Sequence, residues 1–305
     1  MRHIFIINPT AGRRDNSASV VKNIEKVCKA RGLEYDIYLT AHPKHATEIV
    51  IHSARKFEGK LRFYACGGDG TLNEVAAGAA EAGENCSFTS IPIGTGNDYV
   101  KLFEGGREAF LDLDRLIDGT EIDIDYIRSD CGCSINVLSV GIDAEVARGK
   151  GKYKMFGNGL LPYAASAVEC VIRGIGKEYY INIDGEQLDG NYTLVFIGNG
   201  RFYGGGFCPV PCSKIGDGLL DVLLVKKVSR LEAAALVSKY KSGRYKELSQ
   251  YITYKQAKEI KIFSKSNEDM CINLDGEVVE SRHISMRIEP QKLRFVIPKG
   301  SSVLE

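Results

Sequence analysis

The stretch Cys66-Gly67-Gly68-Asp69-Gly70-Thr71-Leu72-Asn73-Glu74 lies between a predicted strand, the apolar run 61–65, and a predicted helix near 71–82. Glycines at such a junction let the backbone turn tightly and approach a ligand, and the N–H groups that open the helix attract anions. A bare Gly-Gly-Asp-Gly is also ordinary turn chemistry. A carboxylate beside a polyanion needs a cation or a reacting proton between them, so Asp69 in this position favours phosphate chemistry.

Three further segments place small polar residues after an apolar run or a glycine cluster. They are Asn8-Pro9-Thr10-Ala11-Gly12-Arg13-Arg14 after the run 4–7, Gly94-Thr95-Gly96-Asn97-Asp98 after 91–93, and Lys214-Ile215-Gly216-Asp217-Gly218-Leu219-Leu220-Asp221 after Gly204-Gly205-Gly206. In this order along one chain, the four motifs are much more specific than any one of them.

The first part of the chain, up to about residue 125, alternates apolar strands with amphipathic helices. Strands are predicted at 3–7, 34–40, 61–66 and 88–93, and helices near 17–31, 46–57 and 71–82. Such alternation predicts a Rossmann-like α/β domain with a parallel sheet. Ligands of these sheets bind beyond the carboxyl ends of the strands, where the glycine-rich loops would converge.

The second part, residues 126–290, has short alternating runs and turn signals instead. Strands are predicted at 178–184, 187–198, 219–226, 258–264, 270–275, 284–289 and 293–297, with helices near 155–173 and 230–241. Asp184-Gly185 and Asp275-Gly276 are typical of hairpin turns. This pattern predicts an antiparallel β-sandwich domain, so the fold class is α/β plus β.

The composition excludes several classes of protein. The 305 residues are 44% hydrophobic and 26% charged with a net charge of +1, which gives no electrostatic case for nucleic acid binding. No run approaches the roughly 18 apolar residues of a membrane span, and the apolar start is too short for a signal peptide. The nine scattered cysteines are interpreted as buried residues or free thiols. We expect a cytoplasmic protein whose membrane contact, at the inner face, is peripheral.

The four motifs together identify a family. The chain resembles a soluble bacterial lipid kinase of the diacylglycerol kinase catalytic-domain family, which is related to sphingosine kinases and, through Gly-Gly-Asp-Gly-Thr, more distantly to NAD kinases. The resemblance runs from Asn8 to at least Glu277. It implies a nucleotide-binding first domain, a β-rich second domain, and a return of residues 291–305 to the first domain.

The resemblance also implies a nucleotide site. The positions that match it are Asn8, Pro9, Thr10, Ala11, Gly12, Thr40, Gly67, Gly68, Asp69, Gly70, Thr71, Leu72, Asn73 and Thr95. Without the resemblance, Thr40 would be interpreted as a helix or turn cap. Arg13 and Arg14 either add charge to the phosphates or are simply solvated.

Two metal-related groups are implied as well. Asp69, Asp98 and Asp123 match acidic positions that organise water and magnesium in relatives, although strand alternation puts Asp125 on the same face as Asp123 and leaves the choice between them open. Asp217 matches a magnesium ligand that is joined by the backbone carbonyls of Lys214 and Leu219. The alternative for Asp217 is a plain Asp-Gly turn.

The resemblance places the general base at Glu277, with Asp69 as the second catalytic residue. A carboxylate in this role accepts the proton of a lipid hydroxyl as that hydroxyl attacks phosphorus. The tripeptide Asp275-Gly276-Glu277 occurs a second time as Asp184-Gly185-Glu186, which we interpret as a hairpin only.

We therefore expect a lipid kinase that uses ATP and Mg²⁺, with diacylglycerol as the default acceptor. Another lipid alcohol (phosphatidylglycerol or a sphingoid base), a soluble acceptor such as NAD, and a non-catalytic nucleotide-binding regulator stay open. The basic and apolar segment 148–163 is the expected membrane contact, and a second basic patch runs through 226–231 toward residue 244. Oligomeric state is open, a homodimer included.

Overall fold

The computed structural model of the chain describes residues 1–12, 15–149, 176–266 and 268–304. The chain divides into two compact units, one formed by Met1–Ile124 with Gln291–Glu305 and the other by Asp125–Pro290. The predicted fold class is confirmed, because the first unit has a parallel sheet and the second an antiparallel one. The predicted helix near 155–173 and the pair Arg13 and Arg14 lie outside the described residues.

The first unit is built on a parallel sheet with the strand order β2-β1-β3-β4, and β16 adds to it beside β4. Its strands are β1 (Arg2–Ile7), β2 (Tyr35–Leu39), β3 (Leu61–Gly67) and β4 (Cys86–Pro92), and β5 (Thr120–Ser129) leads out of the unit. Every residue of β3 and β4 is buried. Strands buried on both faces are typical of the centre of a parallel sheet, and here β4 also buries the polar residues Ser87, Thr89 and Ser90.

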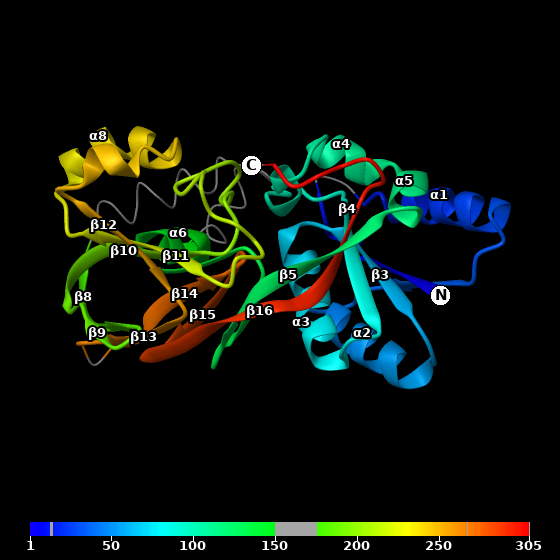
Figure 1. The fold of residues 1–305 in the computed structure, drawn as a ribbon, viewed down its shortest axis with the longest axis horizontal. Helices are drawn as coiled ribbons and strands as arrows, with labels where there is room; N and C mark the ends of the chain where they lie inside the picture. The colour runs from blue at the N-terminus through cyan, green and yellow to red at the C-terminus, as the bar shows by residue number, and fades with distance from the viewer. Residues whose placement is uncertain (13–14, 150–175, 267, 305) are drawn as a thin grey trace. The chain divides into compact units, whose positions relative to one another are not determined.

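Helices cover both faces of this sheet (Figure 1). They are α1 (Ser17–Ala30), α2 (His45–Lys56), α3 (Asp69–Ala82), η1 (Tyr99–Leu102), α4 (Gly106–Leu111) and α5 (Leu113–Ile117). Helices α2 and α3 lie together on one face, where a Cβ on Gly78 of α3 would stand 2.7 Å from the Val50 side chain of α2. The small residue thus sets the close approach of the two helices.

The core of the first unit includes an aromatic cluster around Phe295 of β16. Its ring lies 5.4 Å from Phe88, 5.2 Å from Tyr99 and 5.3 Å from Phe103, measured between ring centroids. The hydroxyl of Thr89 also donates to the Val296 carbonyl at 2.7 Å. Residues near the end of the sequence are therefore integral to the core of this unit.

The second unit is an antiparallel structure with the strand order β15-β14-β7-β10-β8-β13-β16, from which β11 and β12 extend beside β10. Its strands are β6 (Gly132–Ser134), β7 (Val137–Gly141), β8 (Lys177–Ile183), β9 (Glu186–Gln187), β10 (Gly190–Gly198), β11 (Leu220–Lys226), β12 (Ile252–Ala257), β13 (Glu259–Ser264), β14 (Met270–Leu274), β15 (Glu277–Ser281) and β16 (His283–Ile297). Its helices are α6 (Ile142–Gly149), α8 (Arg230–Lys241) and η3 (Tyr245–Leu248). Inward-facing side chains such as Ile181, Val195 and Ile260 are fully buried and form its main core.

Both predicted Asp-Gly turns close two-residue hairpins. Asp184 and Gly185 join β8 to β9, and Asp275 and Gly276 join β14 to β15. All four residues have positive φ angles, between 47° and 93°. That backbone matches the strand twist and favours glycine and aspartate.

Strand β16 differs from the prediction of two strands at 284–289 and 293–297. It is one strand of fifteen residues that passes Pro290 without ending, and Gln291 absorbs the irregularity with a positive φ of 49°. Its first part pairs with β13 in the second unit and its last part with β4 in the first. Pro290 suggested that the strand would end there. Pairing with β13 before residue 290 and with β4 after it keeps the strand extended.

Among the described residues, no helix combines the length and apolar character needed to cross a lipid bilayer.

Candidate active site

Three loops of the first unit meet at the carboxyl edge of its sheet. The Asn8 amide donates to the Thr71 hydroxyl at 3.1 Å, which links the loop after β1 to the start of α3. The Gly94 N–H donates to the Gly67 carbonyl at 2.9 Å, which links the loop after β4 to that after β3. The loops after β1 and β4 also lie against each other, since a Cβ on Gly12 would stand 2.8 Å from the Ile93 carbonyl oxygen. The predicted convergence of the three loops within this unit is thus observed.

We call the three loops together the cradle, and their glycines allow backbone segments to lie in direct contact. A Cβ on Gly94 would stand 2.5 Å from the Cα of Gly68, and one on Gly67 would stand 2.2 Å from the Thr71 hydroxyl oxygen. Gly68 precedes the first turn of α3, whose N–H groups lack helical partners. The result is a surface of backbone donors without side chains in the way, which suits a phosphate group.

Asp69 is the first residue of α3 and lies at the centre of the cradle. Its carboxylate accepts a hydrogen bond from the Tyr99 N–H at 3.1 Å, and a Cβ on Gly96 would lie 3.0 Å from it and 3.8 Å from the Asp98 carboxylate. Burial, and then the negative charge of Asp98, raise the pKa of Asp69 to about 6. Two carboxylates therefore face one point, where a bound cation would relieve their repulsion.

Asp98 is buried and forms an ion pair with Lys101 at 2.5 Å. The residue before it, Asn97, has a positive φ of 50° and donates from its side chain to the Gly94 carbonyl at 2.7 Å. This contact fixes the turn that presents Asp98. The role of Asn97 was not predicted from the sequence, although the preference of asparagine for positive φ was a signal for it.

Some of the other predicted nucleotide contacts shape the loops at the sheet edge. Thr10 and Ala11 donate hydrogen bonds to Asn8 and shape its loop together with Pro9. The Thr40 N–H donates to the Ile7 carbonyl at 2.9 Å, which places Thr40 at the same sheet edge. Thr95 is exposed and Gly70 has open space around its Cα, whereas Leu72 and Asn73 are buried. Leu72 thus contributes to the core, and a contact from it to ligand would use its backbone.

Glu74 has a structural contact. Its carboxylate accepts the Ala46 N–H at 3.1 Å, and its carbonyl accepts the Thr47 hydroxyl at 2.7 Å. Both partners lie in the first turn of α2, whose unpaired N–H groups attract an acidic side chain. Glu74 therefore caps α2 from the neighbouring helix α3.

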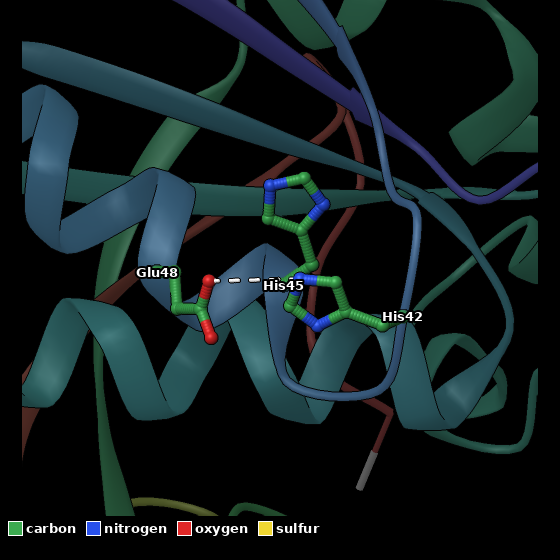
Figure 2. Close-up of side chains that lie close together, drawn as sticks. All are labelled: His42, His45 and Glu48. Carbon is green, nitrogen blue, oxygen red and sulfur yellow. Dashed lines mark ion pairs between the residues drawn. The ribbon is translucent and has the colours of Figure 1, made fainter.

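Two histidines, His42 and His45, lie at the start of α2, shortly after Thr40 in the sequence (Figure 2). The rings of His42 and His45 stack with centroids 4.6 Å apart and planes 15° apart, and His42 Nε2 lies 3.9 Å from the Glu48 carboxylate. Lone pairs of stacked rings run side by side instead of converging on one ion. His45 Nδ1 also accepts the Ala41 N–H at 3.0 Å. Imidazole nitrogen is in addition a poor ligand for magnesium, so we assign no phosphoryl-transfer role to this group.

The predicted magnesium loop lies in the second unit, between β10 and β11. The Asp217 carboxylate accepts the Leu219 N–H at 3.1 Å, and the Gly218 N–H donates to Asp125 at 2.7 Å. Burial raises the pKa of Asp217, and the charges of Asp221 and Asp125 raise it further. Clustered carboxylates around an exposed Asp217 suit a divalent cation held by oxygen ligands. Lys214 is exposed at the start of the loop.

Strand alternation left Asp123 and Asp125 equivalent, but their surroundings differ. Asp123 is exposed on β5, whereas Asp125 is fully buried and its N–H donates to the Ile215 carbonyl at 2.7 Å. Asp125 therefore braces the loop of Asp217 from both its side chain and its backbone. Within the described residues, no hydrogen bond or ion pair joins Asp123 to another predicted site residue.

Two residues that brace the same region were missed from sequence. The buried Asn199 side chain donates to the carbonyls of Asp125 and Ile135, each at 2.9 Å. The buried Arg201 guanidinium donates to the Ser213 carbonyl at 2.7 Å. Both lie directly after the buried strand β10, and polar residues in that position were the signal to follow.

Glu277 is the first residue of β15 and is half-buried. The hairpin that carries it is anchored by Asp275, whose carboxylate accepts N–H groups of Ile135, Asn136 and Val137 at 2.8, 3.3 and 2.7 Å. Burial raises the pKa of Asp275 to about 6, against the opposing effect of these hydrogen bonds. The sequence alone predicted only a turn at Asp275, so this anchoring role was missed.

The two Asp-Gly-Glu tripeptides differ in what surrounds the glutamate. Glu186 is exposed and forms an ion pair with Lys255 at 2.6 Å. Glu277 is instead half-buried. Its neighbours Gly276 and Val278 line a hollow of about 490 Å³ together with Ala147, Arg148 and Glu280, and strand alternation directs the Glu277 side chain to the opposite face of β15. Arg148 pairs with Glu280 at 2.5 Å at this hollow, and the rest of the predicted membrane contact, 150–163, lies outside the described residues.

The comparisons with known proteins agree with this architecture. Residues 2–129 match the family described as "Diacylglycerol kinase catalytic domain", and residues 136–297 match "YegS C-terminal NAD kinase beta sandwich-like domain". A protein of Xanthomonas oryzae named "Probable lipid kinase YegS-like" is 29% identical over 289 residues, which are 90% of this chain and 91% of that one. A diacylglycerol kinase of Staphylococcus carnosus is 28% identical over 275 residues, 90% of this chain and 87% of that one.

Solved structures share the fold. A Bacillus anthracis structure superposes with a TM-score of 0.77 at 21% identity and covers 99% of this chain and 96% of its own. The two family matches between them extend from residue 2 to residue 297, the second alone over more than half of the chain. The resemblance inferred from the motifs is confirmed: this chain belongs to the diacylglycerol kinase catalytic-domain family of lipid kinases, with a YegS-type β-sandwich, and is a phosphotransferase with an alcohol acceptor.

Proposed function

We propose that this chain transfers the γ-phosphoryl group of ATP, in a magnesium-dependent reaction, to the hydroxyl of diacylglycerol and so forms phosphatidate. The observation that carries the proposal is the meeting of three glycine-rich loops around Asp69 in the first unit. Phosphoryl transfer is catalysed largely by positioning and by charge stabilisation, and this cradle offers backbone donors and carboxylates for a cation in one place.

On the donor side, the N–H groups around Gly68 and Gly94 would hold the phosphates, and Asp69 and Asp98 would hold ordered water or cation beside them. Oxygen ligands that act directly or through water suit Mg²⁺, so the residues present fit this ion. Magnesium, when bound, neutralises charge on the phosphoryl group. Asp217, with the carbonyls of Lys214 and Leu219, would form a second magnesium site, braced by Asp125.

On the acceptor side, Glu277 would receive the proton of the lipid hydroxyl. As the hydroxyl oxygen bonds to the γ-phosphorus, the bond from phosphorus to the ADP oxygen breaks, and the hydroxyl proton passes to the carboxylate. A positioned base of this kind contributes on the order of 10²- to 10⁴-fold to the rate. The half-buried position of Glu277 on a hairpin anchored by Asp275 supports this role, whereas Glu186 is held in a surface ion pair.

Diacylglycerol is the proposed acceptor because the chain's family and its relative from Staphylococcus carnosus carry that name. A different lipid alcohol would use the same residues. A soluble acceptor such as NAD, or a regulator that binds nucleotide without turnover, are the alternatives that the experiment separates.

The experiment follows γ-labelled ATP with magnesium and mixed micelles that each carry a single lipid. We expect label in the organic phase, strongest with diacylglycerol, and none with Asp69→Ala. Label that stays in the aqueous phase on a new product would indicate a soluble acceptor. Nucleotide binding without any labelled product would indicate a regulator.

The base is tested by a matched pair of substitutions in the two Asp-Gly-Glu tripeptides. We expect Glu277→Gln to lower kcat by roughly 10²-fold or more, and Glu186→Gln to leave it unchanged. A Glu277→Gln effect confined to nucleotide affinity would show that its role is misassigned.

A further inference from the structure

The charge of this chain is distributed very unevenly. Segment 226–247, which we call the basic segment, contains seven basic and two acidic residues and so carries +5, whereas the whole chain carries +1 and the remaining residues therefore carry −4. The basic residues are Lys226, Lys227, Arg230, Lys239, Lys241, Arg244 and Lys246. Such a concentration on one short segment creates a local positive field that the net charge conceals.

The two acidic residues of the basic segment form hydrogen bonds or ion pairs with residues of the segment or next to it. Glu232 forms the capping box of α8 with Ser229, at 2.7 and 3.3 Å, and accepts the Tyr251 hydroxyl at 3.2 Å. Glu247 pairs with Lys239 at 3.2 Å and lies 3.5 Å from Arg244. Lys226, Lys227 and Lys246 are exposed and remain available to a negatively charged partner.

Helix α8 in this segment is only weakly amphipathic, because apolar side chains lie on its exposed side as well as on its buried side. Tyr240 and Leu236 turn toward the core cluster of Phe196 and Leu223. On the other side, Leu231 is 85% exposed and Val237 is 48% exposed. The exposed Ala234 and Ala235 share the outer face with Leu231, since residues three and four apart lie together on a helix.

The helix is built to hold this face outward. The capping box fixes its start at Arg230, and the buried Tyr240, near its end, packs in the core of the second unit. Figure 1 shows α8 at the outside of this unit, beyond the strands β10 and β12. Exposed apolar side chains on a fixed helix with nearby lysines suit the headgroup layer of a membrane, where apolar burial and attraction to anionic lipid act together.

We propose that α8 docks the protein on a bilayer of anionic phospholipid. Leu231 and Val237 enter the headgroup layer, and Lys226, Lys227 and Lys246 contact lipid phosphates. The charge complementarity selects an anionic membrane as the occupant of this face. The proposal rests on the proposed lipid acceptor, which gives the enzyme its need for a membrane surface, but it makes a separate claim about binding.

The test is sedimentation of the full-length protein with vesicles of phosphatidylcholine, with and without phosphatidylglycerol. We expect binding only to the anionic vesicles and its loss at high salt. Replacing Lys226 and Lys227 with glutamate should weaken binding by about 30-fold or more, since two basic groups near the surface are removed and two acidic groups introduced. The matched control replaces Lys22 and Lys26, two exposed lysines of α1, and should bind as wild type.

The apolar contact is tested by Leu231→Glu, which is tolerated by the fold because the side chain is exposed. We expect loss of vesicle binding, whereas Phe263→Glu, at an exposed apolar position of β13 in the same unit, should retain it. Turnover of diacylglycerol in vesicles should fall with Leu231→Glu, while turnover of a water-dispersed short-chain diacylglycerol should stay unchanged.

The readouts keep the two proposals apart. Vesicle binding that depends on Leu231 supports docking even if no lipid is phosphorylated, an outcome that would overturn only the proposed acceptor. Equal binding to neutral and anionic vesicles, or unaltered binding of Leu231→Glu, overturns docking. A decrease in molar mass of Leu231→Glu without vesicles, measured by light scattering, would assign the face to a second copy of the chain and overturn docking as well.

Discussion

At the scale of single residues, the cradle in the first unit holds a carboxyl group in surroundings that disfavour its charge. Burial and the neighbouring Asp98 raise the pKa of Asp69 from its ordinary 3.8 to about 6. Active sites often keep such groups because their ligand, here the proposed cation, restores the lost stabilisation. The unliganded protein should therefore be less stable with Asp69 than with a neutral residue of the same shape.

Asp69→Asn should accordingly raise Tm at neutral pH while removing phosphoryl transfer. A carboxyl group with a raised pKa stabilises the fold fully below its unfolded value of 3.8, and this contribution is lost as the pH rises through about 6. The Tm difference between variant and wild type should thus grow from pH 4 to pH 7. Each kcal/mol of difference in the free energy of unfolding corresponds to roughly 2 to 4 °C in Tm. Calorimetry without magnesium or nucleotide measures it.

The exposed Glu104 provides the control, because Glu104→Gln should give no such growth. A Tm difference for Asp69→Asn that stays flat across this range would contradict the raised pKa and the burial that causes it. Asparagine keeps an oxygen for the Tyr99 N–H, so a lost hydrogen bond does not confuse the comparison.

At the scale of elements, both Asp-Gly hairpins are held by an aspartate carboxylate that accepts backbone N–H groups, but the two carboxylates differ in burial. Asp275 accepts three N–H groups at the β6–β7 turn and is buried, whereas Asp184 accepts those of Lys258 and Glu259 at an exposed turn. A buried N–H left without an acceptor costs about 1 to 3 kcal/mol, while an exposed one is satisfied by water.

Asp275→Ala should therefore lower the free energy of unfolding by about 2 to 3 kcal/mol, and Asp184→Ala by about 1 kcal/mol or less. Urea unfolding of both variants measures the difference. Equal losses would mean that the three hydrogen bonds of Asp275 add little beyond the turn itself.

Elements were predictable from sequence where one local pattern dominates. Helix α8 was expected at 230–241 and is found at Arg230–Lys241, because its cap and periodicity are both local. Strand β7 was missed, since five fully buried residues have no alternation, and β12 and β15 were missed because their burial is partial along the strand. Asp123 and Asp125 were indistinguishable for a related reason: the contact of Asp125 with Gly218 joins residues 93 positions apart.

The candidate site was likewise predictable where it follows from local patterns and not where it depends on long-range contacts. The loops at Asn8, Gly67 and Gly94 follow buried strands of a parallel sheet, so their meeting follows from topology. The bracing by Asn199, Arg201 and Asp275 depends on the irregular antiparallel unit, whose pairings cannot be read from a pattern of period two. Roles in catalysis came from the family resemblance and stay predictions.

At the scale of the whole molecule, β16 contributes to both units, and Phe295 is its key side chain in the first. Phe295→Ala should lower the free energy of unfolding by about 3 to 5 kcal/mol, since a fully buried ring among Phe88, Tyr99 and Phe103 is removed. Faster hydrogen exchange should appear in β3 and β4. Phe263→Ala, which truncates a half-exposed ring, is the control and should cost less than about 1 kcal/mol.

The shared strand also has a consequence for how the protein is made. Thr89 finds its partner Val296 only after a further 207 residues have been synthesised. The three loops of the proposed nucleotide site are encoded early, yet the core that supports them lacks Phe295 until the ribosome has translated the second unit. A chain interrupted anywhere before β16 would thus lack a complete core in its first unit, so the proposed site for ATP would be without its support until synthesis is nearly finished.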